Sequence, residues 1–188
     1  MMMLVMLLLP AAASSQDLPK TTPIRPRSNP DSYVRPRSAT PTTGQIYVGD
    51  RAPDFELDRS DGRAAKLSSF RGQWTLLIFA NRRDEIAAFR VIEPELTSSG
   101  IQIVGVCHEK TAALKSVAAR DTVRYALLSD QTGEVSAMYG LYDPLRSETL
   151  PGFLVLDPPG VVRVTLLGKA FPPEDIAKLV EFIVGTRP

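Results

Sequence analysis

The chain has 188 residues, of which 44% are hydrophobic, and this is enough for one well-buried core. Its formal net charge of +1 gives no indication of a nucleic-acid-binding protein. With one cysteine, Cys107, and one histidine, His108, the chain cannot form an intramolecular disulfide, a dithiol redox motif or a structural zinc site, so no metal or cofactor is expected.

Residues 1–13 (MMMLVMLLLPAAA) are wholly apolar. As a helix they would extend about 20 Å, which is too short for a hydrocarbon core of about 30 Å, so no stable membrane span is expected. Small residues follow, and the first charge is Asp17. Although no Lys or Arg precedes the apolar run, residues 1–15 are predicted to be a secretory signal peptide. The protein is therefore expected to be exported, to a periplasm or to the extracellular space.

Residues 16–45 contain six prolines, few large apolar residues, and five basic against two acidic residues, which leaves a local net charge of +3. An imperfect ten-residue repeat, IRPRSNPDSY followed by VRPRSATPTT, lies within this segment. Such a composition cannot bury enough surface to offset the entropy of ordering, and it predicts a disordered Pro/Arg-rich linker. An alternative is a basic strip that touches an anionic partner, such as a cell-surface polymer or lipid headgroups.

The pattern changes to alternating strands and helices after residue 45. An extended segment at 54–57 leads into a turn at 60–63, where Asp-Gly favours a hairpin. Residues 67–70 (LSSF) are predicted to form a short helical turn. Trp74–Ala80 (WTLLIFA) is a continuous apolar run of strand length, as expected for a strand that is buried on both faces.

The next segments continue this alternation. Residues 84–97 carry apolar side chains at nearly helical spacing and predict one helix that is kinked at Pro94. Residues 101–107 (IQIVGVC) predict a second buried strand, and residues 111–119 a second helix.

The last third of the chain adds an extended segment at 126–128 and a helix at 133–139. Two strands at 153–157 and 161–167 are joined by Pro-Pro-Gly, which is a hairpin signal. A closing helix is predicted over residues 172–184.

This order of elements limits the topology. The first two long strands must be parallel and joined by a right-handed crossover, whereas the last two must be antiparallel. The sequence therefore predicts one α/β domain over residues 46–188 with a thioredoxin-like fold, in which a central mixed β-sheet is flanked by α-helices.

Five segments, in order and at matching spacing, resemble the AhpC/TSA peroxiredoxins, also called redoxins. The resemblance extends from Val48 to about Arg163 and rests on these segments: VGDRAPDFEL, KLSSFRGQWTLLIFA, IVGVCHEK, LLSDQTGEVSAMYGL and GFLVLDPPGVVR. It implies the thioredoxin-like fold and the chemistry of antioxidant oxidoreductases. Members of this family reduce peroxides with a cysteine thiolate on the first turn of the helix that follows the central strand.

The resemblance weakens at the site of that chemistry. In the family a proline and a threonine precede that cysteine in the active-site loop, and an arginine on a neighbouring strand lowers the pKa of the thiol. Here Glu85–Phe89 (EIAAF) matches the family, but residues 81–84 form a shortened loop without those three residues, and Pro151 stands about where the arginine belongs. The candidate binding positions at the edge of the site are Asn81, Arg82, Arg83 and Pro151.

Pro151 has two interpretations. LPGFLVLD resembles the thioredoxin-like arrangement in which a cis-proline faces the redox site, whereas an ordinary turn proline has a trans peptide bond.

Cys107 is the remaining candidate for a catalytic thiol. It falls at the carboxyl end of the second buried strand, the edge at which open α/β sheets place their sites. Arg82, Arg83 and His108 could favour its thiolate form if they lie close to it. The alternative is that Cys107 is an inert, small hydrophobic residue packed at the end of a strand.

These observations lead to competing functional hypotheses. The first is an exported pseudoenzyme, a non-peroxidase scaffold or binding module that binds another protein or ligand. The second is a one-cysteine antioxidant oxidoreductase that uses Cys107 with an external thiol reductant. A third is a subunit that modulates an active peroxiredoxin, and the resemblance is also compatible with a homo-oligomer.

Overall fold

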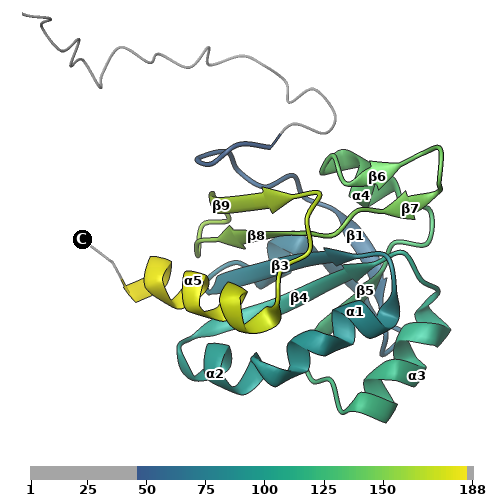
Figure 1. The fold of residues 1–188 in the computed structure, drawn as a ribbon, viewed down its shortest axis with the longest axis horizontal. Helices are drawn as coiled ribbons and strands as arrows, with labels where there is room; N and C mark the ends of the chain where they lie inside the picture. Colours follow the sequence, from purple (N-terminus) through teal and green to yellow (C-terminus); the bar gives the residue numbers. More distant parts are fainter. Residues whose placement is uncertain (1–45, 186–188) are drawn as a thin grey trace, which may run out of the picture. The chain divides into compact units, whose positions relative to one another are not determined.

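A mixed sheet of seven strands forms the centre of the described part of the chain, residues 46–185, in this computed structural model (Figure 1). The strands are arranged in the order β2-β1-β5-β4-β3-β8-β9. The predicted signal peptide and linker lie outside the described residues. The strand bounds are β1 Glu56–Arg59, β2 Ala64–Lys66, β3 Trp74–Ala80, β4 Ile101–Cys107, β5 Ala126–Ser129, β8 Gly152–Leu156 and β9 Val162–Leu167.

The centre of the sheet is parallel and its edges are antiparallel. β3 pairs in parallel with β4, in a register that places Ala80 beside Cys107, and β4 pairs in parallel with β5. β8 runs antiparallel to β3, and β9 antiparallel to β8. The predicted parallel first pair, the antiparallel last pair and the α/β thioredoxin-like fold are all confirmed.

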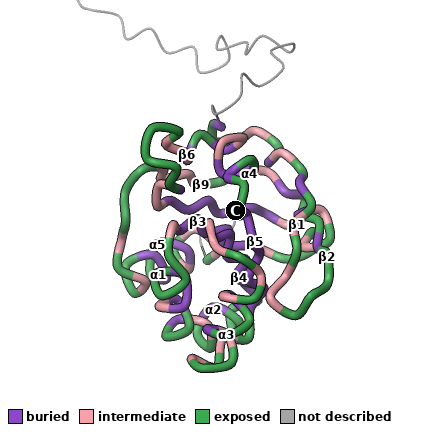
Figure 2. Tube along the Cα trace, turned by 90° about the vertical axis from the view of Figure 1, so that its right-hand side faces the viewer, coloured by how far each residue is buried: buried purple, intermediate pink, exposed green. Residues whose placement is uncertain are grey.

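Helices cover both faces of the sheet, and the purple strands in Figure 2 show how completely the central strands are buried. The first face carries four α-helices and a 3-10 helix, and the second carries one α-helix, a 3-10 helix and the segment 46–55. On the first face lie α1 Arg83–Ala87, η3 Ala88–Val91, α2 Glu93–Ser98, α3 Thr111–Asp121 and α5 Pro173–Gly185. On the second lie η2 Leu67–Phe70 and α4 Glu134–Met138.

β3 contributes to both hydrophobic layers. Leu76, Ile78 and Ala80 pack under the helices of the first face, whereas Leu77 and Phe79 pack on the second. Alternate side chains of a strand point to opposite faces, so a strand covered on both sides is apolar at nearly every position, and Thr75 is the one polar residue of β3. This explains why WTLLIFA has no polar alternation.

The single kinked helix predicted over residues 84–97 is wrong, because the segment consists of α1, η3 and α2. Pro94 lies in the first turn of α2 and not in a helix interior. Proline is tolerated there, since the amide groups of a first turn have no partner within the helix. Proline therefore starts a new helix where a kink was expected.

A two-stranded hairpin formed by β6 (Tyr142–Asp143) and β7 (Glu148–Thr149) was not predicted. Its turn is stabilised by Asp143, whose Oδ1 atom accepts hydrogen bonds from the amides of Leu145 and Arg146 at 2.9 and 3.3 Å. Strands of two residues are too short to show an alternating pattern.

Within residues 46–185, no helix is both long and apolar enough to span a bilayer.

Gly105 in β4 allows α1 to approach the sheet closely. A Cβ atom at this position would lie 2.6 Å from Cγ1 and 2.9 Å from Cδ1 of Ile86, which belongs to α1, and 3.2 Å from Cδ2 of Leu127. All three residues are buried. The first turn of α1 is therefore positioned by the absence of a side chain in the strand beneath it.

We expect Gly105→Ala to lower the free energy of unfolding by about 1–3 kcal/mol, because overpacking a closed core forces its neighbours to move. Urea denaturation measures the change. Gly185→Ala is the matched control, because a Cβ atom there meets nothing within 4 Å. Equal stability of the two variants would show that α1 can move away from β4 without cost.

Two buried tyrosines make the fold sensitive to alkaline pH. The hydroxyl of Tyr125 donates a hydrogen bond to the carbonyl oxygen of Ile86, and that of Tyr139 donates one to the carbonyl oxygen of Pro53 at 2.7 Å. Burial raises the pKa of both phenols above the usual value, and for Tyr139 the negative charge of Asp54 adds to the shift.

A phenol with a higher pKa in the folded than in the unfolded protein stabilises the fold fully at pH values below the pKa of the unfolded state, which is about 10. This stabilisation decreases as the pH rises above that value. We therefore expect the free energy of unfolding to decrease above a pH of about 10. Tyr139→Phe should cost about 1 kcal/mol near neutral pH, because it removes one hydrogen bond, and should weaken the alkaline dependence. Urea denaturation over a pH series tests both effects; an unchanged alkaline slope in the variant would contradict the assignment.

Candidate functional site

A groove of about 520 Å³ lies at the carboxyl end of β3. It is lined by the end of β3, the beginning of α1, the segment 148–153 and the connection between β9 and α5. This is the edge at which open α/β sheets place their binding sites. Its polar lining residues are Asn81, Arg82, Glu85, Glu148, Thr149 and Lys169.

Aromatic rings form much of the apolar lining. Phe89 and Phe153 are buried, and the ring of Phe153 packs edge-on against that of Phe171 with 6.1 Å between the centroids. The Nζ atom of Lys169 lies 5.4 Å from the centroid of the Phe171 ring. This distance corresponds to a cation–π contact, which keeps a positive charge at the rim of an apolar surface.

Asn81 joins the end of β3 to the β6–β7 hairpin. Its Oδ1 atom accepts a hydrogen bond from the amide of Thr149 at 3.2 Å. The Thr149 hydroxyl donates to Oγ of Ser136 at 2.9 Å, and the Ser136 hydroxyl donates to the carboxylate of Asp130 at 2.7 Å. Thr149, Ser136 and Asp130 are all buried, so this satisfied polar network fixes one wall of the groove.

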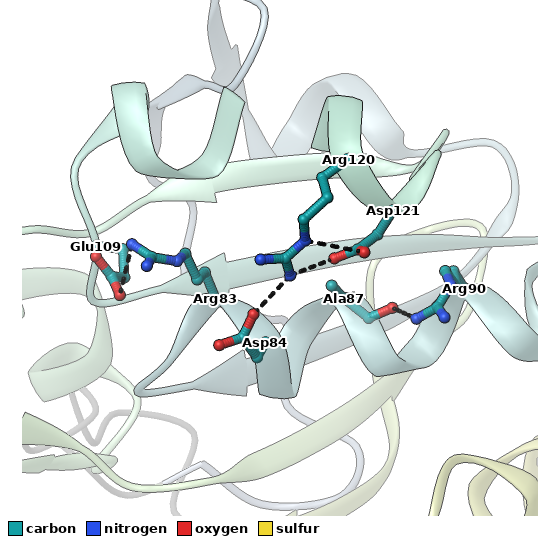
Figure 3. A network of polar contacts seen from close by, with 7 residues as sticks. All are labelled: Arg83, Asp84, Ala87, Arg90, Glu109, Arg120 and Asp121. Atoms are coloured by element: carbon teal, nitrogen blue, oxygen red, sulfur yellow. Dashed lines mark hydrogen bonds and ion pairs between the residues drawn. The ribbon is translucent and has the colours of Figure 1, made fainter. Parts of the chain in front are cut away.

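Ion pairs between exposed side chains connect α1 to α3 and to Glu109, which follows β4 (Figure 3). Asp84 accepts a hydrogen bond from Nη2 of Arg120 at 2.7 Å, and the same guanidinium contacts Asp121 through two hydrogen bonds. The hydrogen bonds from Arg120 hold the pKa of both carboxyls below their usual range. Nη1 of Arg83 lies 3.9 Å from Oε1 of Glu109, the residue that follows His108. The Arg83 side chain is therefore directed toward Glu109.

Glu85 caps α1 and also lines the groove. Its Oε2 atom accepts a hydrogen bond from the backbone amide of Arg82 at 3.3 Å, as in the second half of a capping box. The carboxylate is thus engaged by the helix start, while the exposed side chain of Arg82 belongs to the groove lining.

Cys107 is fully buried in the first-face core, together with residues of α1 and α3. Its Sγ atom lies 3.7 Å from the carbonyl oxygen of Asn81. Burial raises the pKa of the Cys107 thiol well above its usual range, and the carboxylates of Glu109 and Glu85 add to the shift, which outweighs the opposite effect of Arg83. The neutral thiol is therefore the stable form.

The structure brings together three of the five predicted site residues. Asn81, Arg82 and Pro151 line the groove, whereas Arg83 and Cys107 are not part of its lining. No peptide bond within residues 46–185 is cis, so Pro151 has the trans geometry of the turn interpretation.

His108 follows Cys107 but has different neighbours. Its Nδ1 atom lies 3.0 Å from the carbonyl oxygen of Asp130, and its ring lies 5.7 Å from that of Tyr142. In the part of the chain that the structure describes, no group of three or more His, Cys, Asp or Glu side chains could hold a metal ion.

Sequence reasoning missed most of the groove lining, including Phe89, Phe153, Phe171, Glu148 and Lys169. The two buried phenylalanines have the pattern of ordinary core residues in their own elements, and nothing in the pattern indicates that they meet. Lys169 and Phe171 lie in the connection between β9 and α5, and that place is the only signal for them, because connections at the carboxyl edge of a sheet converge on one site.

The chain matches known proteins across this domain. Residues 48–165 match the model of the AhpC/TSA family. An alignment of 154 residues with the chloroplastic peroxiredoxin Q of Oryza sativa subsp. japonica is 30% identical and covers 73% of this chain and 70% of that protein. The crystal structure of the peroxidoxin BcpB from Mycobacterium tuberculosis superposes with a TM-score of 0.68 at 21% identity, over 77% of this chain and 100% of that one. With its fold and the greater part of its domain matched in this way, the chain belongs to the AhpC/TSA family, the peroxiredoxins.

Proposed function

We propose that this protein is a non-peroxidase member of the AhpC/TSA family that uses the groove at the end of β3 to bind a ligand. The observation that carries the proposal is the position of Cys107, the single cysteine of the sequence: it is fully buried and is not part of the groove lining. The first turn of α1 instead consists of Arg83, Asp84 and Glu85.

The reaction of a thiol peroxidase explains why this position matters. A thiolate attacks one peroxide oxygen, the O–O bond breaks, and the products are a sulfenic acid and an alcohol or water, after which a thiol reductant restores the thiol. The attacking sulfur must be ionised and must touch the peroxide. Cys107 meets neither requirement, because its raised pKa favours the neutral thiol and the chain around it excludes solvent.

The rival proposal, a one-cysteine antioxidant enzyme, rests on one contact. The Sγ atom of Cys107 lies 3.7 Å from the carbonyl oxygen of Asn81, and Asn81 is one of the residues that line the groove. The thiol is thus separated from the groove by the chain at the end of β3. Peroxide reduction through Cys107 would require this segment to open, with an external thiol as the reductant.

We expect no peroxide turnover above the background rate, with or without a thiol reductant, and the same result for Cys107→Ser. A peroxide-consumption assay on the purified protein measures this. Alkylation of Cys107 near neutral pH should be at least about a hundredfold slower in the native protein than in denaturant, because the buried thiol is neutral. Turnover that Cys107→Ser abolishes, together with rapid native alkylation, would establish the one-cysteine enzyme instead.

The proposal includes export of the protein, with residues 1–15 as a signal peptide and residues 16–45 as a linker to the domain. The apolar run followed by small residues supports it. We expect the mature protein to begin between Ala13 and Asp17 and to be found in the periplasm or the medium. N-terminal sequencing of native protein from fractionated cells provides the measurement. An intact Met1 on protein from the cytosolic fraction would contradict export.

A further inference from the structure

The polar lining of the groove offers hydrogen-bond donors. Asn81 already uses its Oδ1 atom to accept from the Thr149 amide, which leaves its NH2 group for a ligand. Glu85 accepts one hydrogen bond from the Arg82 amide through Oε2, and its carboxylate, like that of Glu148, remains part of the lining. The side chains of Arg82 and Lys169 add a guanidinium and an ammonium, which are donors only. A ligand group that contacts these side chains must therefore be an acceptor, and an anion satisfies them best.

The rest of the groove is apolar and aromatic. Phe89, Phe153 and Phe171 contribute rings to the lining, and Pro151 and Ile176 extend this surface. A volume of about 520 Å³ lies within the range of roughly 300–1,000 Å³ that is typical of sites for small molecules. An apolar surface beside a small number of donors matches a ligand with a nonpolar body and one charged end.

From this arrangement we infer that the groove binds an organic monocarboxylate that carries an apolar chain. The carboxylate contacts Asn81, Arg82 and Lys169, and the chain lies on the phenylalanine rings. This inference rests on the proposed binding function and specifies its ligand class.

Glu148 provides an internal check on the sign of the ligand charge. It also lines the groove, and its carboxylate opposes a bound anion but would favour a bound cation. Removing its charge therefore has opposite effects on the two kinds of ligand.

The experiment is calorimetric titration of the purified full-length protein with octanoate near neutral pH. Octanol, which lacks the charge, acetate, which lacks the chain, and octylammonium, which reverses the charge, serve as comparison probes. We expect octanoate to bind saturably and at least about tenfold more tightly than each of them, since a charge-assisted contact and the burial of an apolar chain each contribute about that much.

The adjacent residues Arg82 and Arg83 form a matched pair of variants. Both are exposed, but Arg82 lines the groove and Arg83 pairs with Glu109 outside it. We expect Arg82→Gln to weaken octanoate binding about tenfold, Lys169→Gln to weaken it in the same direction, and Arg83→Gln to leave it unchanged. Glu148→Gln should bind octanoate more tightly and octylammonium more weakly than the parent protein. Thermal unfolding midpoints within a few degrees of that of the parent protein show that each variant is folded.

Three results would overturn the inference: no saturable octanoate binding by the folded protein, equal weakening by Arg82→Gln and Arg83→Gln, or tighter binding of octanol or octylammonium than of octanoate. The peroxide assay separates this failure from that of the proposed function. If the protein shows neither turnover nor octanoate binding, only the inferred ligand class is rejected. If it shows turnover that depends on Cys107, the proposed function itself is rejected.

Discussion

The parallel pairing of β3 with β4 is the constraint on which the rest of the structure depends. Because β3 lies between β4 and β8 and is covered on both faces, its seven residues cannot alternate between apolar and polar types. The two strands end in register, with Ala80 beside Cys107. At this shared edge the chain leaves the core, and the groove forms where the connections after β3, before β8 and after β9 converge. The absence of a side chain at Gly105 then allows α1 to lie directly on this edge.

The same edge explains why neighbouring residues of the chain have different roles. Arg82 and Arg83 are consecutive, yet one lines the groove and the other pairs with Glu109. α1 begins at Arg83, so the direction of successive side chains changes at this point from that of an extended chain to that of a helix. Asp84 is directed toward Arg120, and Glu85 turns back to the amide of Arg82. Of these four consecutive charged residues, Arg82 lines the groove, Arg83 and Asp84 pair with groups outside it, and Glu85 both lines the groove and caps α1.

The sequence was sufficient to predict the fold because β3 and β4 are long, apolar runs bounded by clear turn signals. It was less informative where local patterns are short or ambiguous. Pro94 is compatible with a kink and with a helix start, and β6 and β7 are too short to alternate. For the site, Asn81, Arg82 and Pro151 were chosen from the resemblance as positions at the edge of the family's site, and all three line the groove. Phe171 and Lys169 were missed, since their place in the groove depends on how the connection after β9 folds back against residues that are more than eighty positions earlier in the chain.

The apolar lining of the groove is shared with the core of the domain. Phe89 and Phe153 are buried and belong to the first-face core, so the rings that line the groove also hold that face of the domain together. Here the rings remain together with Asn81, whose orientation is fixed by a buried polar network that extends to Asp130. A network of that kind stabilises only when every member is satisfied, so it constrains four positions to support one wall of the groove. This wall lies beside an apolar surface, while the single thiol of the sequence lies in the closed core, and both observations support the proposal that the groove binds a ligand without reacting with it.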